Sequence, residues 1–223
     1  MAEFKIEKAA VEKNPFLGLF MRANDEVLLV PPKVPRNVLK LAEEALKVPS
    51  QKLLIDQSYL IGTFCAVNST GCVLPSFADK KEIHTIKKLG FNVFLMEELP
   101  ACGNNILTND KAAVINPRIS KHDATQISDC LGVEVFSQKP LSNVYSPGSA
   151  NVVTNKGLLA YNETPIAELK MLEKTFTVKG SVGSSNLGVP FNGISVVANK
   201  NGALVGQETS GFEVQRVYEA LNG

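Results

Sequence analysis

The residues that most often carry acid–base or metal chemistry are few in this 223-residue chain. Its two histidines, His84 and His122, match no metal-ligand spacing, and both fall in predicted helices where we expect them on the surface. The adjacent carboxylates at 43–44 and 97–98 would point apart on a helix or a strand. The sequence has neither a phosphate-binding loop nor a Gly-x-Ser-x-Gly elbow. These patterns predict no catalytic residue, no metal site and no cofactor.

The cysteines offer a second kind of chemistry. Cys65 and Cys72 flank one predicted turn, so a disulfide between them is one alternative. The N-terminus shows no signal-peptide pattern, which favours the other alternative, reduced thiols in a cytoplasmic protein. Three of the four cysteines lie in apolar strand or helix patterns, where we expect buried side chains. The full set is Cys65, Cys72, Cys102 and Cys130.

The overall charge argues against an autonomous nucleic-acid binder. The net charge is +1, and the chain has only four arginines, the residue on which bidentate phosphate recognition usually relies. Lysines at 80, 81, 87 and 88 form either a basic patch or a solvated helix face, and we favour the solvated face. No run approaches the ~20 apolar residues that span a bilayer, so we expect no membrane contact.

A repeated hairpin dominates the organisation of the chain. Residues 60–75 predict two strands joined by an Asn-Ser-Thr-Gly turn. Four other segments share the pattern of a glycine, a mostly apolar segment, an asparagine and a second apolar strand. The glycines are Gly18, Gly62, Gly103, Gly148 and Gly193. The asparagines are Asn24, Asn68, Asn109, Asn155 and Asn199, which lie 44, 41, 46 and 44 positions apart.

Each hairpin is followed by a predicted amphipathic helix and, in the first four copies, by a third strand. Asp79 with Glu82 forms a capping-box pattern at one helix start, while Gly90 and Gly132 follow the ends of two helices. The third strands are expected at residues 53–55, 92–96, 133–136 and 177–179. The glycine- and serine-rich stretch 180–188 predicts a surface loop.

The two ends of the chain complement each other. The fifth helix, residues 210–222, has no strand after it, whereas the strand at 4–8 has no preceding hairpin. We expect this strand to complete the fifth unit, because closure removes free sheet edges. The sequence therefore predicts a single α/β domain, 1–223, built as a closed pentein-type ring of five ββαβ-like repeats with pseudo-fivefold symmetry. The expected repeats are about 12–56, 57–98, 99–139, 140–182 and 183–223 plus 4–8.

The pentein fold also occurs in enzymes, so the sequence can be searched for their catalytic residues. Pentein-fold deiminases and amidinotransferases modify guanidines with a cysteine near the C-terminus, a histidine and acidic residues. Here the last cysteine is Cys130 and no histidine follows His122. The catalytic set of that family is missing, so we expect a protein that is not an enzyme and has no small-molecule substrate. A divergent guanidine-modifying enzyme with an atypical site is the alternative.

A set of motifs spread over all five units resembles the archaeal translation initiation factor 6 family. They are NPFLGLFMRAND at 14–25, LVPP at 29–32, CGNNILTND at 102–110, LGVEVF at 131–136, TNKG at 154–157, GVPF at 188–191 and GALVG at 202–206. The resemblance implies a monomeric factor that binds the large (50S) ribosomal subunit through ribosomal proteins and a neighbouring rRNA loop. It would sterically prevent association with the small (30S) subunit. The alternative within the family is a ribosome-biogenesis scaffold without anti-association activity.

Candidate contact residues follow from the repeat glycines. We expect these glycines to be structural, where inner strands pack closely around the axis. Polar residues follow three of them, and we predict Thr63, Asn104 and Asn105 to face the ribosome, with Arg22 as a further candidate. Ordinary hydrogen bonding within the ring is the alternative for each residue.

Two segments depart from the family pattern. The stretch 180–188 lacks the arginine of the family's Gly-Thr-Val-Asn-Arg-Gly segment, and Tyr161-Asn162 replaces an expected His-Pro. We expect these departures to affect the strength or mode of subunit binding rather than the fold.

Overall fold

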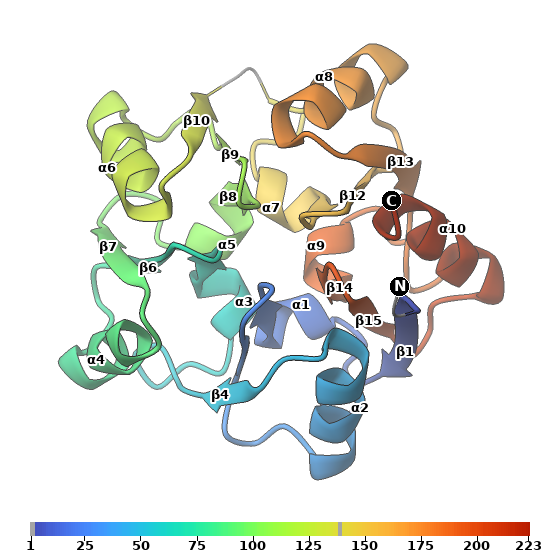
Figure 1. The fold of residues 1–223 in the computed structure, drawn as a ribbon, viewed down its shortest axis with the longest axis horizontal. Helices are drawn as coiled ribbons and strands as arrows, with labels where there is room; N and C mark the ends of the chain where they lie inside the picture. Colours follow the sequence, from blue (N-terminus) through green and yellow to red (C-terminus); the bar gives the residue numbers. More distant parts are fainter. Residues whose placement is uncertain (1–2, 138–139) are drawn as a thin grey trace.

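The computed structural model describes residues 3–137 and 140–223 as an α/β arrangement of five three-stranded sheets and ten helices (Figure 1). In every sheet a short strand pairs antiparallel with a central strand, and a third strand pairs parallel with the other side of the central one. The repeated pairing explains the repeated sequence pattern. The predicted unit boundary at residue 139 lies outside the described residues.

We number the sheets 1 to 5 along the chain. They are β2(Arg22–Ala23)–β3(Leu28–Val30)–β4(Ser50–Lys52), β5(Ala66–Val67)–β6(Gly71–Pro75)–β7(Asn92–Met96), β8(Ile106–Thr108)–β9(Ala112–Ile115)–β10(Glu134–Ser137), β11(Val152–Val153)–β12(Gly157–Tyr161)–β13(Lys179–Gly183) and β14(Val196–Asn199)–β15(Gly202–Gly206)–β1(Lys5–Ala9). The expected pairing of the N-terminal strand with the fifth unit is confirmed, since β1 runs parallel to β15 from Lys5–Gly202 to Ala9–Gly206.

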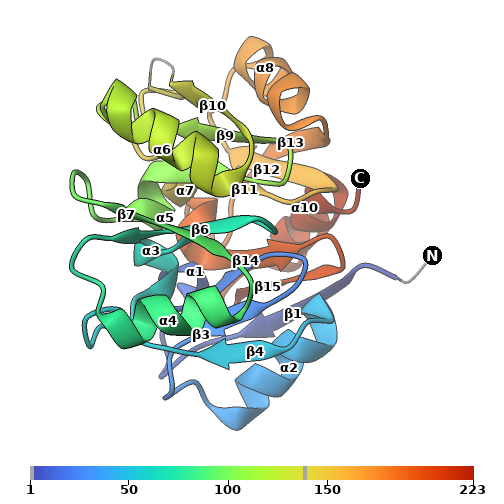
Figure 2. The ribbon, with the colours of Figure 1, turned by 60° about the vertical axis from the view of Figure 1, so that its left-hand side comes forward.

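The helices fall into two groups. Five single-turn helices immediately precede the first strand of a hairpin: α1(Leu17–Phe20), α3(Ile61–Phe64), α5(Cys102–Asn105), α7(Pro147–Ala150) and α9(Asn192–Ser195). Five longer helices follow the central strands: α2(Arg36–Leu46), α4(Lys80–Lys88), α6(Lys121–Leu131), α8(Ile166–Phe176) and α10(Gly211–Leu221). The single-turn helices lie near the middle of the molecule in Figure 1, and Figure 2 shows α2, α4 and α6 along the outside.

Local sequence explains where the longer helices begin and end. Asp79 accepts hydrogen bonds from the backbone N–H groups of Lys81 and Glu82, and the Glu82 carboxylate accepts one from the Asp79 N–H, as the capping-box pattern predicts. Gly132 ends α6 in the left-handed conformation, with φ of 65°, which favours glycine.

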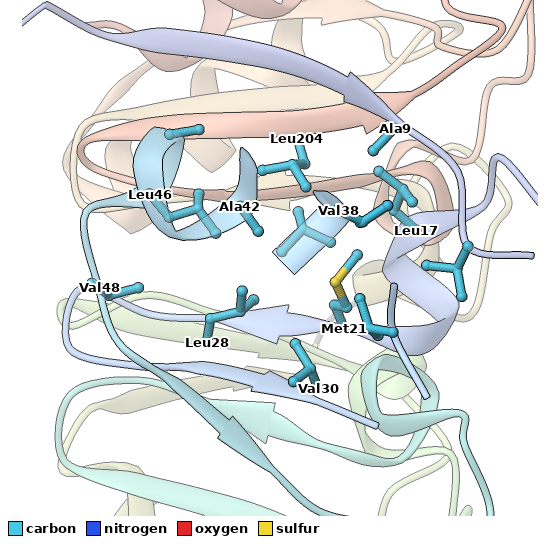
Figure 3. Close-up of a cluster of buried hydrophobic side chains, with 14 residues drawn as sticks. Ala9, Leu17, Met21, Leu28, Val30, Val38, Ala42, Leu46, Val48 and Leu204 are labelled. Atoms are coloured by element: carbon cyan, nitrogen blue, oxygen red, sulfur yellow. The ribbon is translucent and has the colours of Figure 1, made fainter. Parts of the chain in front are cut away.

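The hydrophobic cores lie between consecutive units rather than within them. On the central strand β3, Leu28 and Val30 belong to the cluster that packs against α2 and Leu204 of sheet 5 (Figure 3), whereas Leu29 belongs to the cluster shared with unit 2. Side chains alternate between the two faces of a strand, so each central strand contributes to two cores. Five such clusters link the units in sequence and connect the fifth unit back to the first.

Three details of the predicted elements were wrong. The repeat glycines lie in single-turn helices instead of inner strands, and the strands that follow are only two to four residues long. The third strand of unit 1 is at Ser50–Lys52 rather than 53–55. The third strand of unit 4 is at Lys179–Gly183 rather than 177–179, so the predicted loop at 180–188 begins as part of β13, whose small residues pair in register with Gly157–Tyr161.

Candidate binding surface at the helix end of the hairpins

The five single-turn helices touch through their glycines. A Cβ added to Gly62 would collide with the Gly18 carbonyl oxygen, and one added to Gly103 would collide with that of Gly62. In the same way, a Cβ on Gly148 would meet the Gly103 carbonyl and one on Gly193 would meet that of Gly148. The series closes because a Cβ on Gly18 would meet the carbonyl of Gly193. Neighbouring turns therefore approach so closely that any side chain at these positions would separate them.

The turn asparagines connect the opposite end of the hairpins, where strand one turns into strand two. Asn68 is buried, and its Oδ1 accepts hydrogen bonds of 3.0 Å from the backbone N–H groups of Thr70 and Gly71, which fixes its own turn. Its Nδ2 donates to a carbonyl of the next unit. The equivalent donations are Asn199 to Asn24 at 3.0 Å, Asn24 to Asn68 at 2.8 Å, Asn68 to Asn109 at 3.2 Å and Asn109 to Thr154 at 3.1 Å.

Three of these asparagines also complete a helix end in the neighbouring unit. The last carbonyls of an α-helix lack intrahelical donors, so a side-chain amide that reaches them removes a buried unsatisfied acceptor. The pairs are Asn199 with Leu46 at 2.8 Å, Asn68 with Leu131 at 2.8 Å and Asn109 with Phe176 at 3.1 Å. One side chain thus joins a turn, the next turn and the next helix.

Unit 4 breaks the asparagine pattern, and the assignment of Asn155 as its turn residue was wrong by one position. The Thr154 N–H donates to the Gly157 carbonyl, as the Asn68 N–H does to Gly71. The Thr154 hydroxyl oxygen accepts from the N–H groups of Lys156 and Gly157, at 3.1 and 3.0 Å. A hydroxyl fixes the turn but is too short to reach the next unit, so within the described residues no donation from Thr154 to unit 5 replaces the missing link.

Asn155 instead belongs to a polar group that covers this turn end. Its Nδ2 donates to Asp25 at 2.7 Å and to Asp110 at 2.5 Å. Ser69 donates to Asp110 through both its N–H and its hydroxyl, each at 2.8 Å. Lys200 forms an ion pair of 3.6 Å with Asp25. Both carboxylates are therefore occupied by groups from other units.

The predicted contact residues lie at the other end, which we call the helix end because it carries the single-turn helices. Asn104 and Thr63 are half-buried there, and among the described residues neither side chain has a hydrogen-bond partner. The Thr63 hydroxyl oxygen is itself closed off from solvent, so it is not available to a partner at the surface. Asn105 is buried, and its amide is occupied: Nδ2 donates to the carbonyls of Leu99 and Ala101 at 3.3 and 3.0 Å, and Oδ1 accepts from Asn116. Asn105 thus orients the α5 turn that presents Asn104.

Arg22 is half-buried, and its guanidinium points towards two other units. Its Nη2 donates to the carbonyl oxygens of Gly62, at 2.6 Å, and Gly103, at 3.0 Å. The side chain borders a cavity of about 40 Å³ between the helix end and the turns. Burial lowers the pKa of the Arg22 guanidinium from its ordinary value, although an arginine remains charged at neutral pH. Arg22 therefore supports the turns that contain Gly62 and Gly103, and its predicted contact with the ribosome stays a prediction.

Aromatic and basic residues surround the helix end in the first units. The Lys33 ammonium lies 5.0 Å from the centre of the Tyr59 ring, and the Arg118 guanidinium lies 4.6 Å from that of Tyr145. Phe77 packs edge-on against a neighbouring ring and remains 43% exposed. Sequence reasoning missed these residues because each cation and its aromatic partner are far apart in the chain.

The corresponding loop positions differ in charge around the molecule. Each central strand leads into a four-residue turn. The third residue of this turn is basic or aromatic in units 1 to 3 and acidic in units 4 and 5. These exposed residues are Lys33, Phe77, Arg118, Glu163 and Glu208. The helix end is therefore electrostatically asymmetric, in spite of the repeated backbone.

The groups with potential chemistry are dispersed. All four cysteines are free and buried, which corresponds to the reduced alternative, whereas both histidines are exposed on α4 and α6. The lysines at 80, 81, 87 and 88 are exposed on or beside α4. Across residues 3–137 and 140–223, no three metal-binding side chains come together. Within the same residues, no helix has both the length and the apolar character needed to cross a membrane.

These features define a class of protein: an interlocked repeat scaffold whose units share their cores and whose helix end presents aromatic, basic and unpaired polar groups. The family model of the eIF-6 family matches residues 6–220, and the chain belongs to this family. It is similar to proteins named translation initiation factor 6. That of Pyrococcus horikoshii is 40% identical over 223 residues, covering 97% of this chain and 98% of the relative. That of Thermoplasma acidophilum is 33% identical over 218 residues, covering 97% of this chain and all of the relative.

Proposed function

We propose that this chain is a translation initiation factor that binds the large (50S) ribosomal subunit and sterically prevents its association with the small (30S) subunit. The names of its full-length relatives support the translation role. We further propose a single-domain, monomeric, cytoplasmic scaffold without catalytic activity, a pentein-type closed ring with pseudo-fivefold symmetry. The cyclic glycine contacts support this fold assignment.

The observation that carries the proposal is the aromatic and basic helix end of units 1 to 3. Tyrosine and arginine are enriched in binding hot spots, and exposed pairs such as Arg118 with Tyr145 present both in one place. Asn104, on the α5 turn, supplies a polar side chain with no partner among the described residues. Thr63 lies on the neighbouring α3 turn, but its hydroxyl is closed off from solvent, so Asn104 is the polar contact that we propose here. We propose that this arc contacts the subunit.

The charge asymmetry gives the proposed surface an orientation. Cations at Lys33 and Arg118 suit rRNA phosphates, whereas carboxylates at Glu163 and Glu208 suit basic ribosomal proteins. A factor that acts by steric occlusion needs a rigid structure and no mobile segment. The shared cores and the asparagine contacts provide such a body, because displacing one unit disturbs its neighbours.

Sedimentation with purified archaeal ribosomal subunits tests the function. The protein is expected to co-migrate with 50S subunits and to reduce the fraction of joined ribosomes as its concentration rises. If it neither co-migrates nor reduces joining, the proposal fails. Binding only to immature large subunits, with joining of mature subunits unchanged, would instead identify a biogenesis scaffold.

A pair of variants tests the surface separately. The double change Arg118→Ala with Tyr145→Ala is expected to weaken 50S binding by at least about 10-fold, because truncating a hot-spot residue costs about 2 kcal/mol or more. Lys88→Ala, an exposed change on the outer helix α4, is the matched control and should bind as the unchanged protein does. Equal binding by both variants would place the contact elsewhere.

A further inference from the structure

The longer helices of units 1 to 3 begin with exposed cations that helix electrostatics disfavours. The N-terminal end of an α-helix bears a partial positive charge, so anionic side chains stabilise its first turn and cationic ones do not. The first two positions of α2, α4 and α6 nevertheless hold these exposed basic residues: Arg36, Lys80, Lys81, Lys121 and His122. The same positions of α8 and α10 are neutral: Ile166, Ala167, Gly211 and Phe212.

Contacts within the protein do not compensate these cations. Among the described residues, no ion pair involves any of them. The acids at the start of α4 serve the backbone instead: Asp79 accepts from the N–H groups of Lys81 and Glu82. The buried Glu82 carboxylate accepts from the N–H groups of Asp56 and Asp79. Residues that break a local rule without a local gain are expected where function requires them.

These helix starts extend the positive charge already described at the helix end. Lys33 and Arg118 lie in the turns that lead into α2 and α6, three positions before the first residue of each helix. Figure 1 shows α2, α4 and α6 in consecutive places around the periphery. We call the six cations of this arc the basic rim: Lys33, Arg36, Lys80, Lys81, Arg118 and Lys121. Because the whole chain has a net charge of only +1, the field of the rim is local to units 1 to 3.

The lysines of α4 fall into two pairs with different surroundings. Lys87 and Lys88 lie in the last turn, where the helix dipole favours a cation, so solvation accounts for them. Lys80 and Lys81 lie in the first turn, where neither the dipole nor an ion pair accounts for them. The expected solvated face therefore fits the end of α4 and not its start.

An RNA backbone is the partner that matches a row of cations from three units. RNA carries a negative charge at every phosphate, so it offers a continuous row of anions. Long blocks of like charge are rare on folded protein surfaces, because such blocks repel and are mostly disordered. Exposed lysines without fixed hydrogen bonds suit contact with phosphates, whereas reading of base edges requires donors held in place.

We propose that the basic rim contacts the phosphate backbone of rRNA without reading its sequence. This inference rests on the proposed binding to the 50S subunit and names the residues that supply its electrostatic part. The neutral helix starts of α8 and α10, with Glu163 and Glu208 in the preceding turns, place no RNA along units 4 and 5.

The salt dependence of 50S binding measures the number of phosphate contacts. Each contact contributes about 0.7–0.9 to the slope of log affinity against log salt concentration. The fourfold change Arg36→Gln, Lys80→Gln, Lys81→Gln and Lys121→Gln is therefore expected to reduce this slope by about 3. The matched control neutralises four exposed lysines outside the rim, with Lys87→Gln, Lys88→Gln, Lys170→Gln and Lys174→Gln, and should keep the slope of the unchanged protein. Equal slopes for the two variants would overturn the proposal.

Tethered hydroxyl-radical cleavage distinguishes rRNA from an acidic ribosomal protein as the partner. The native cysteines are buried, so an iron–EDTA reagent can be attached selectively to Asn37→Cys, beside Arg36, or to Asn162→Cys in unit 4 as the control. With the 50S subunit bound, position 37 is expected to cleave rRNA more strongly than position 162. Binding without rRNA cleavage from position 37, or with stronger cleavage from position 162, would refute the basic rim and leave the proposed function standing. Failure of the unchanged protein to bind 50S subunits would refute both.

Discussion

Asn68→Ala tests the idea that the turn asparagines hold the units together. The Asn68 side chain makes four hydrogen bonds at a site that is only 2% exposed: two donations to Asn109 and Leu131 and two acceptances from Thr70 and Gly71. Removing the side chain leaves both carbonyls without this donor and both N–H groups without this acceptor.

The expected loss follows from this count. A buried intramolecular hydrogen bond contributes about 1 kcal/mol net, so four bonds predict a loss near 4 kcal/mol in the free energy of unfolding. Native proteins have ~5–15 kcal/mol in total, and for a chain of this size the loss corresponds to a fall in Tm of about 8–16 °C. Asn68→Asp keeps the two turn acceptances but replaces the donating amide with an oxygen facing two carbonyls. We expect it to be at least as destabilising as Asn68→Ala at neutral pH.

Urea unfolding measures these differences through the midpoint and the m-value. Asn162→Ala, an exposed asparagine in the loop after β12, is the matched control and should change stability by less than about 0.5 kcal/mol. A loss below about 1 kcal/mol for Asn68→Ala, or one equal to that of the control, would refute the structural role of the turn asparagines.

Three further predictions concern the glycines, one carboxylate and the thiols. Gly62→Ala should lower the free energy of unfolding by at least ~3 kcal/mol or prevent folding, because its Cβ would collide with backbone carbonyls. Gly211→Ala, which has open space around it, is the control and should be neutral or stabilising in the same urea assay. Burial alone would raise the pKa of Glu213, but hydrogen bonds from Ser210, Gly188 and neighbouring groups outweigh it and lower the pKa. Because the pKa of Glu213 is lower in the folded state, this group stabilises the protein above its pKa in the unfolded state, and the stabilisation is lost as the pH falls through its pKa in the folded state. Acid titration below about pH 4.5 should therefore lower the free energy of unfolding. Glu213→Gln should remove this part of the pH dependence of stability. The four buried thiols should react with a bulky maleimide only on unfolding; rapid labelling of the native protein, followed by mass spectrometry, would contradict their burial.

The sequence predicted the repeat well and its innermost geometry poorly. Hairpins, long helices and the pairing of β1 with β15 follow from patterns that extend over many residues. The single-turn helices do not, because four residues are too few to show a helical period and an apolar run of that length resembles a strand. Their conformation depends on the close approach of turns such as those at Gly18 and Gly62, which exists only once the units have assembled.

The site residues show the same division. At the turn of unit 4 the asparagine pattern points to Asn155, one position after the residue that fixes the turn, because the Thr154 hydroxyl accepts the two N–H groups that an asparagine Oδ1 accepts elsewhere. The sequence suggests Arg22 as a contact residue, but its hydrogen bonds to the Gly62 and Gly103 carbonyls depend on where the neighbouring units place those groups. The Asn104 side chain has no partner among the described residues, whereas the Asn105 amide is bonded to Asn116. This contact with another part of the chain distinguishes the two asparagines, and the sequence does not show it.

An image of this protein bound to an archaeal 50S subunit, by electron cryomicroscopy, tests the central claim most directly. We predict that the helix end of units 1 to 3, with Asn104 and the Arg118–Tyr145 pair, faces the intersubunit surface, and that the body of the protein overlaps the position of the docked 30S subunit. A complex that instead presents the turn end, with Asp25 and Asp110, to the 50S subunit would contradict the account. So would binding at a place that leaves the 30S docking surface open.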